Sequence, residues 1–281
     1  MPLHDLSYQR FEGARTSRLA RSLAMARSSG SLLLRRRSFL LLLAVSWISV
    51  ILRGAQIFVA HSFPDAFPFL TIDARLWQEF VSQQVLYLPV ILIALYTGAG
   101  AISADLASGA FVVYLSKPIS RSDYVIGKAL PVVTALLAVT LAPALILLLV
   151  HLFLAEDLVL FQSAPLLPLS VIGYSVWTCS YFTLAVLAIS SLSRSSRVAG
   201  AGFVALSLGG PIFLKAISRL PIFDPPAFLS MIDATVDSGH LFFGDVSAGR
   251  TPFRSFVAMA VLMAVSVAVL RFRLRSAEVS S

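Results

Sequence analysis

Charged residues are scarce in this sequence. Of its 281 residues only 13% are charged, whereas 58% are hydrophobic. A soluble domain carries roughly 25% charged residues, so the surplus of apolar side chains must face lipid rather than a protein core. The composition excludes an ordinary soluble domain and predicts a single helical bundle in a membrane.

Residues that carry chemistry are also few. The one cysteine, Cys179, lies in an apolar run, so it excludes an internal disulfide and is expected to be a small buried side chain. His4, His61, His151 and His240 do not cluster with acids at metal-ligand spacing, and no metal site is expected. No catalytic set of residues is recognisable, which argues against an enzyme.

A phosphate-binding loop is absent as well. Gly127-Lys128 is followed by Ala129 and Leu130 rather than by Ser or Thr, so the chain is not expected to hydrolyse ATP. The glycines of GAGAISAD around Gly98 follow no strand, and we interpret them as sites of close helix packing.

Acidic residues are missing from the centres of the apolar runs. An ion-coupled secondary transporter would need buried acids near the membrane midplane, so this class is disfavoured. The net charge of +8 could suggest nucleic acid as a partner. Because the basic residues are spread over short connectors and no binding motif accompanies them, we expect no nucleic-acid partner.

The apolar residues form six runs, each close to the ~20 residues that cross a bilayer. Together they predict an all-α membrane protein with a six-span domain at residues 38–281. The third run is too long for one crossing, and the last should begin nearer Thr251. Gly209, Gly210 and Pro211 predict a kink or a break in the fifth run. The runs are Phe39 to Ala60, Val85 to Ile102, Val125 to Leu154, Leu167 to Leu192, Val198 to Ile217 and Phe256 to Leu270.

Basic residues alternate between the connectors in a way that predicts the orientation of the chain. Lys and Arg favour cytoplasmic segments, and most of them fall on the side of the amino terminus. Both termini are therefore expected in the cytoplasm of a multi-pass protein of the cell (inner) membrane. The basic residues on this side are Arg10, Arg15, Arg18, Arg21, Arg27, Arg35, Arg36, Arg37, Lys117, Arg121, Lys128, Arg194, Arg197, Arg271, Arg273 and Arg275.

Residues 1–37 form a basic segment before the first span. Leu19 and Leu23 lie one helical turn apart with arginines around them, which favours an amphipathic helix on the cytoplasmic lipid surface. A disordered basic tail fits the pattern equally well. An organellar transit peptide is a minor alternative, whereas a cleavable signal peptide is not expected.

The external connector at residues 215–252 is unusually rich in Phe and Leu. Its apolar pieces are short and separated by Pro and Gly. Such pieces are typical of short interfacial or re-entrant helices rather than of a plain loop.

The cytoplasmic connector at residues 105–124 begins with Asp105 at the membrane surface. Lys117-Pro118 disfavours helix at Lys117. Ser122 is expected to cap the next span, with Asp123 in its first turn. By spacing alone this is a surface helix, a proline turn and a capped re-entry, and an ordinary loop would fit as well.

This connector resembles the signature region of permease subunits of ATP-binding-cassette exporters, the type-two permease family. The closest resemblance is to the branch associated with multicopper-enzyme maturation. The matching residues are Asp105, Gly109-Ala110, Tyr114-Leu115-Ser116, Pro118-Ile119-Ser120-Arg121 and Gly127-Lys128. Members of the family commonly have Glu, a basic residue and Thr where this chain has Asp105, Leu106 and Ala110.

The resemblance implies that the connector is a coupling helix seated on a separate cytoplasmic ATPase, which would bind ATP and Mg. The residues expected to couple are Asp105, Gly109, Lys117, Pro118 and Arg121. It also implies a dimer with a second, identical or different, permease subunit, and export of a substrate that the sequence does not name. A non-transporting membrane subunit, acting as a mechanotransmitter or scaffold for an external partner, is the alternative.

Two further features carry expectations about the spans. Arg53 is a cation well inside the first span, where charge is costly, so it is expected either to face the subunit interface or transport route, or to reach the outer surface. By resemblance, the second and fifth spans line the central path. Residues expected to act there as hinge or pathway elements are Gly98, Gly100, Gly209, Gly210 and Pro211.

Overall fold

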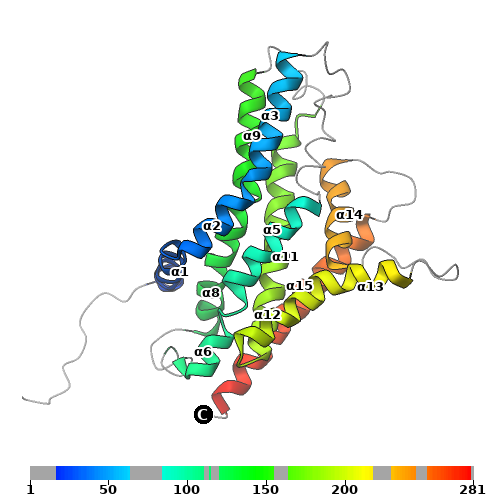
Figure 1. The fold of residues 1–281 in the computed structure, drawn as a ribbon. Helices are drawn as coiled ribbons and strands as arrows, with labels where there is room; N and C mark the ends of the chain where they lie inside the picture. Colours follow the sequence, from blue (N-terminus) through cyan, green and yellow to red (C-terminus); the bar gives the residue numbers. More distant parts are fainter. Residues whose placement is uncertain are drawn as a thin grey trace, which may run out of the picture.

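The computed structural model describes residues 17–63, 84–110, 114, 120–154, 164–217, 229–244 and 252–279. All regular secondary structure in these ranges is helical (Figure 1). Six helical stretches are long and apolar enough to cross a membrane, which confirms the all-α, six-span prediction. They are Arg37–Ser62, Leu88–Ser108, Arg121–Leu154, Leu167–Leu192, Ser196–Phe213 and Pro252–Arg275.

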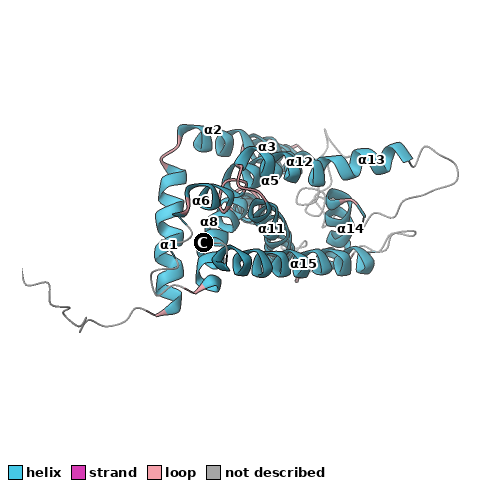
Figure 2. Cartoon of the chain, turned by 90° about the horizontal axis from the view of Figure 1, so that it is seen from below, coloured by secondary structure: helices cyan, strands magenta, loops and turns pink. Residues whose placement is uncertain are grey.

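The fourth span, α11 (Leu167–Leu192), is the centre of the bundle. Figure 2, which looks along the bundle, places α11 between the first span on one side and α15 (Pro252–Val279) on the other. Fully buried Phe182 and Leu187 belong to the main core cluster. At Gly98 of α5 (Gln84–Gly98), a Cβ would lie 2.3 Å from a methyl group of Val186. The glycine therefore lets the second and fourth spans pack closely.

The first and third spans are each broken once, and the two breaks meet. Trp47 separates α2 (Arg37–Ser46) from α3 (Ile48–Ser62), and residues 138–140 separate α8 (Arg121–Leu137) from α9 (Leu141–Leu154). The Trp47 indole donates a hydrogen bond of 3.2 Å to the Ala138 carbonyl. As one straight helix, the third span of 34 residues would be about 51 Å long at 1.5 Å per residue, longer than one bilayer crossing needs. At its break, the Ala138 carbonyl has a partner in the Trp47 indole.

The fifth span is irregular where the sequence predicts an interruption. It consists of α12 (Ser196–Val204), a π-helical segment η1 (Ala205–Gly209) and α13 (Gly210–Ile217). Pro211 has no N–H to donate to the preceding turn, which favours such a change of helix type. Apart from its own helix and chain neighbours, no atom of the described residues lies within 4 Å of a Cβ built at Gly209, so close packing against them does not require this glycine.

The described part of the connector between the fifth and sixth spans contains one helix. Ser230 caps α14 (Met231–Phe243) by accepting a hydrogen bond from the Asp233 N–H, and Gly244 ends it at a positive φ of 74°. The helix is buried against α11 and α15: Tyr174 donates to the Thr235 carbonyl at 2.9 Å, and Ser255 donates to Asp237 at 2.6 Å. This short helix therefore packs as part of the bundle, and whether it is interfacial or re-entrant stays a prediction.

The sixth span begins at Pro252, next to the predicted Thr251. At the other end of the chain, α1 (Arg18–Leu34) lies across the bundle, seen along its axis in Figure 1 and lengthwise in Figure 2. A helix, rather than a disordered tail, therefore forms residues 18–34. It packs on α8, where a Cβ at Gly127 would lie 2.6 Å from the Met25 sulfur.

The two faces of α1 have different surroundings. Ser22 is 3% exposed, whereas Leu23 is 58% exposed. Met25 packs against the small Gly127 of α8, and the exposed Leu23 is accessible to lipid, as in an amphipathic helix on a lipid surface.

Candidate functional site

The connector between the second and third spans is described in part. Residues 105–110, 114 and 120–124 are placed, and the predicted coupling residues Lys117 and Pro118 lie outside the described residues. The second span ends in α6 (Ser103–Ser108), whose C-cap is Gly109 at φ 70°. A left-handed φ favours glycine, so Gly109 ends the helix and redirects the chain.

An ion pair joins the two ends of the connector. The Lys128 ammonium lies 2.6 Å from an Asp105 carboxylate oxygen, and the Tyr124 hydroxyl donates to the same oxygen at 2.8 Å. The Asp105 and Lys128 side chains are only 15% and 11% exposed. Partial burial makes the pair less screened than a surface ion pair. We call Asp105, Tyr124 and Lys128 the latch.

Two aromatic rings surround the cation of the latch. The Lys128 ammonium lies 5.6 Å from the Tyr114 ring centroid and 5.7 Å from that of Tyr124. The two rings are themselves 5.7 Å apart. An ammonium within about 6 Å of an aromatic centroid is attracted to the ring, so Tyr114 ties the middle of the connector to its ends.

The third span is capped two residues earlier than expected. Ser120, not Ser122, is the N-cap of α8: its hydroxyl accepts from the Asp123 N–H at 3.2 Å, while the Ser120 N–H donates to Asp123 at 3.1 Å. This reciprocal capping box needs an acid three residues after the cap, and only Ser120 has that spacing. Arg121 is therefore the first residue of α8, where it is half-buried.

A serine on the central helix holds the start of α6. The backbone N–H groups of Ile102 and Ser103 donate to Ser190 Oγ at 3.1 and 3.0 Å, and Ser190 Oγ donates to the Ala99 carbonyl at 2.8 Å. Ser190 is fully buried. These bonds satisfy the polar groups freed where the second span breaks between α5 and α6.

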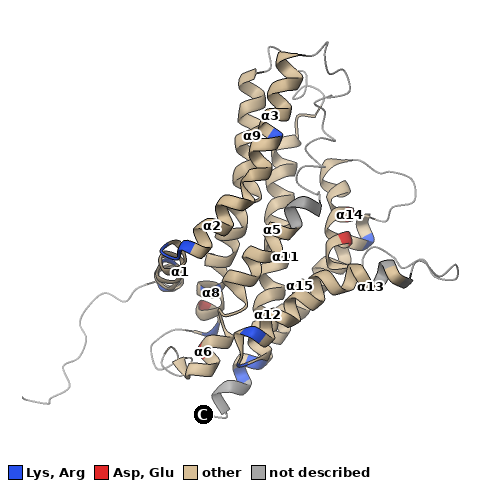
Figure 3. Ribbon diagram, in the orientation of Figure 1, with Lys and Arg blue, Asp and Glu red and all other residues tan. Residues whose placement is uncertain are grey.

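The helix α1 also contacts this region. The Arg21 guanidinium lies 3.7 Å from the Asp123 carboxylate, so α1 is linked to the first turn of α8. Figure 3 shows that Lys and Arg gather on α1 and at the end of the bundle formed by α6, the start of α12 and the end of α15. The connector therefore lies in a basic region.

The other predicted residues lie away from the latch. Arg53 of α3 donates to Gln56 at 2.8 Å and is half-buried. Gly100 lies in the break of the second span, and a Cβ built on it would lie 3.4 Å from Ser196 Oγ. Gly209, Gly210 and Pro211 lie in the irregular part of the fifth span.

A histidine pair forms at the far end of the bundle. His61 Nε2 and His151 Nδ1 are 3.0 Å apart, although 90 residues separate them in the sequence. The two rings close the contact between α3 and α9. No group of three or more His, Cys, Asp or Glu that could hold a metal occurs in the described part of the chain.

Neither the latch partners nor Ser190 follow from the sequence reasoning. Asp105 and Lys128 were singled out, but as separate motif residues, and no pattern marks Ser190 among the serines of the fourth run. The sequence does contain one signal for the latch: charged residues stand at both membrane boundaries of the same connector. Charges at such positions are expected to pair with one another.

A comparison with protein families decides what kind of bundle this is. A family model described as ABC-2 family transporter protein matches residues 31–272, from the end of α1 into α15. The chain belongs to this family. No curated protein matches it. The ABC-2 family chain is thus a membrane subunit of an ABC transporter, which implies an ATPase partner and a lipid environment.

Proposed function

We propose that this ABC-2 family chain is a permease subunit that couples ATP hydrolysis by a separate ATPase to export of an unidentified substrate. The observation that carries the proposal is the latch, because it joins the beginning and end of the connector expected to dock on the ATPase. A connector whose ends are joined moves as one body, so a push on it displaces α6 and α8 together.

The contacts around the latch supply a route for this displacement. Ser190 links α6 to the central α11, and Arg21 links α8 to α1. Lys117, Pro118 and Arg121 are proposed to face the ATPase, because cations on a docking element can pair with acids on a partner surface. ATP and Mg are proposed to bind in the ATPase, and this chain is proposed to have no catalytic role of its own.

A dimer with a second permease subunit accounts for the apolar surface that the chain leaves exposed. Only 17% of the first span window and 22% of the fifth are buried within the chain, and Ile212 and Phe213 are more than 60% exposed. Gly209, Gly210 and Pro211 are proposed as a hinge beside that interface. Arg53 is proposed to face the interface between the two subunits or the transport route. Gly98 and Gly100 are proposed to shape the transport route.

We further propose that the protein lies in the cell (inner) membrane with both termini in the cytoplasm, as its basic residues indicate. Within the family, the sequence resemblance favours the branch associated with multicopper-enzyme maturation. The alternative is a mechanotransmitter that passes ATPase work to an external partner. It would use the same latch, and a transport assay distinguishes the two functions.

The decisive experiment reconstitutes the chain with its ATPase and compares Asp105→Asn, Lys128→Met and the exchanged pair Asp105→Lys with Lys128→Asp. We expect each single variant to reduce membrane-subunit stimulation of ATP hydrolysis about tenfold, and the exchange to recover part of it. The control Asp233→Asn lies in α14, away from the connector, and should stay unchanged.

The mutants must bind the ATPase normally for this result to report coupling. Co-purification therefore accompanies every variant. Full stimulation in both single variants, with the complex intact, would overturn the role of the latch.

A further inference from the structure

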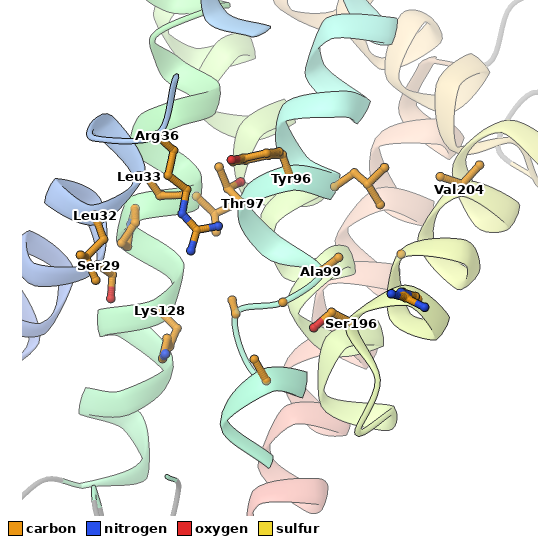
Figure 4. A pocket seen from close by; sticks show the side chains of 18 of the residues that line it. Ser29, Leu32, Leu33, Arg36, Tyr96, Thr97, Ala99, Lys128, Ser196 and Val204 are labelled. Atoms are coloured by element: carbon orange, nitrogen blue, oxygen red, sulfur yellow. The ribbon is translucent and has the colours of Figure 1, made fainter. Parts of the chain in front are cut away.

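A cavity of ≈ 720 Å³ opens between α1, α5, α8 and α12, and the established family membership assigns it no ligand. Figure 4 shows Arg36 and Lys128 reaching toward it from two sides, with Tyr96 and Ser196 on the opposite walls. Among the described residues the lining carries three cations, Arg36, Lys128 and Arg197, and no acidic side chain. The cavity is therefore electropositive.

The cations differ in what already neutralises them. Lys128 is held by Asp105 in the latch, so its charge is largely compensated at 2.6 Å. Arg36 lies in the turn between α1 and α2, and Arg197 lies in the first turn of α12, and both are exposed. These two guanidiniums are the charge that a ligand would meet first, and each can bind a phosphate through two N–H groups.

Much of the remaining lining is apolar, beside the hydroxyl groups of Ser29, Tyr96, Thr97 and Ser196. Leu32 and Leu33 of α1, Pro131 of α8, Leu95 of α5 and Val204 of α12 line the same cavity. A free inorganic anion gains nothing from such walls, whereas an amphiphile places its chain on them and its charged group on the arginines. The chemistry of the cavity is thus that of a charged head on an apolar body.

The cavity also lies at a membrane boundary. Arg36 immediately precedes the first candidate span at Arg37, and Arg197 is the second residue of the fifth span. Basic pockets between transmembrane helices at the cytoplasmic boundary are suited to anionic lipid headgroups.

We infer that this cavity binds the phosphate headgroup of an anionic phospholipid, with Arg36 and Arg197 as its ligands. A lipid held there would bridge α1 to α12, the helix that begins the least regular span. This inference goes beyond the proposed function and does not depend on it, because binding is measured on the chain alone.

The test uses the purified full chain in detergent. Dioctanoyl phosphatidylglycerol is titrated against the thermal unfolding temperature, with dioctanoyl phosphatidylcholine and inorganic phosphate as separate titrations. We expect saturable stabilisation by phosphatidylglycerol only. Arg36→Gln and Arg197→Gln should each weaken its apparent affinity about tenfold, the loss of roughly one charge-assisted contact of 1.4 kcal/mol.

The chain offers a matched control for each variant. Arg35→Gln and Arg194→Gln remove exposed cations close in sequence that do not line the cavity, and both should keep the wild-type affinity. An equal loss in these controls would mean diffuse charge attraction and would overturn the site. Stabilisation by inorganic phosphate as strong as by the lipid, or no saturable effect of phosphatidylglycerol, would also overturn it.

Discussion

The fourth and sixth spans differ in a way that hydropathy does not foresee. In its most apolar window the sixth span is the more hydrophobic of the two, yet only 17% of that window is buried within the chain, against 61% for the fourth. The buried span is the one rich in hydroxyl groups: Ser175, Thr178, Thr183 and Ser190 of α11 are all buried.

The fourth and sixth spans differ in burial because lipid, rather than water, surrounds these helices. Lipid is as apolar as leucine, so a leucine gains little by leaving lipid for a protein interior. Small and polar side chains, by contrast, allow close approach and find hydrogen-bond partners only inside the bundle. Between these two spans, burial therefore follows serine and threonine rather than hydropathy, and this comparison can be tested by substitution.

The largest effect is expected at the closest contact of the central span. Gly98→Leu drives a side chain into Val186 of α11, 2.3 Å from where its Cβ would lie. We expect a loss of about 3 kcal/mol or failure to assemble, because a packed helix pair has no room for a branched side chain. Thermal unfolding in detergent measures it.

Gly209→Leu is the matched substitution in the fifth span, where a Cβ meets nothing within 4 Å. It should shift the unfolding temperature by a small fraction of the Gly98→Leu effect. Equal destabilisation by the two variants would remove the distinction between central and peripheral spans.

A smaller loss is expected at the hydroxyl that anchors α6. Ser190→Ala leaves the N–H groups of Ile102 and Ser103 without their acceptor. The cost should be about 1–2 kcal/mol, with faster hydrogen exchange confined to residues 99–106. Ser266→Ala in the peripheral α15 is the control, and protection at 99–106 that survives Ser190→Ala would contradict the anchoring role.

A smaller loss of stability than for Ser190→Ala is expected at the contact between the breaks of the first and third spans. Trp47→Phe keeps most of the ring but removes the donor to the Ala138 carbonyl. We expect about 0.5–1.5 kcal/mol of destabilisation, the usual net value of one hydrogen bond. Trp177→Phe should lose less stability, because the Trp177 indole nitrogen has no hydrogen-bond partner among the described residues. The reverse order of the two losses would contradict the role of the Trp47 hydrogen bond at the break.

The smallest effect is expected on the outward face of α15. Leu262 is 42% exposed, so Leu262→Ala should change the unfolding free energy by less than about 0.5 kcal/mol, because lipid or detergent fills the space. The same unfolding measurement checks it. A loss as large as the 2–5 kcal/mol of a buried leucine would show that this face is covered by another chain.

Local features of the fold were largely accessible from the sequence. The six spans, the break in the fifth and the start of the sixth near Thr251 follow from apolar run length and from Pro and Gly. The cap of α8 is Ser120 rather than the predicted Ser122, because a capping box requires its acid, here Asp123, three residues after the cap.

The candidate site was accessible only in outline. Asp105, Gly109 and Arg121 were selected by resemblance, and the connector itself by its charges. That Asp105 meets Lys128 and Tyr124 was not foreseeable, because 19 residues separate the Asp105–Tyr124 hydrogen-bond partners and periodicity says nothing across a connector. The amphipathic helix α1 was predictable, whereas its contact with α8 through Met25 and Gly127 was not, because no local pattern marks it.

The sequence by itself determined that this chain forms membrane-spanning helices, where most of them begin and end, and which connector carries the charges. These are local properties, since a bilayer requires about 20 apolar residues and internally satisfied backbone groups. Tertiary structure alone decided which span is central, which serine holds α6, and which cation closes the latch. An apolar helix face has little preference for protein over lipid. These choices therefore depend on close approach and hydrogen bonds between residues far apart in the chain.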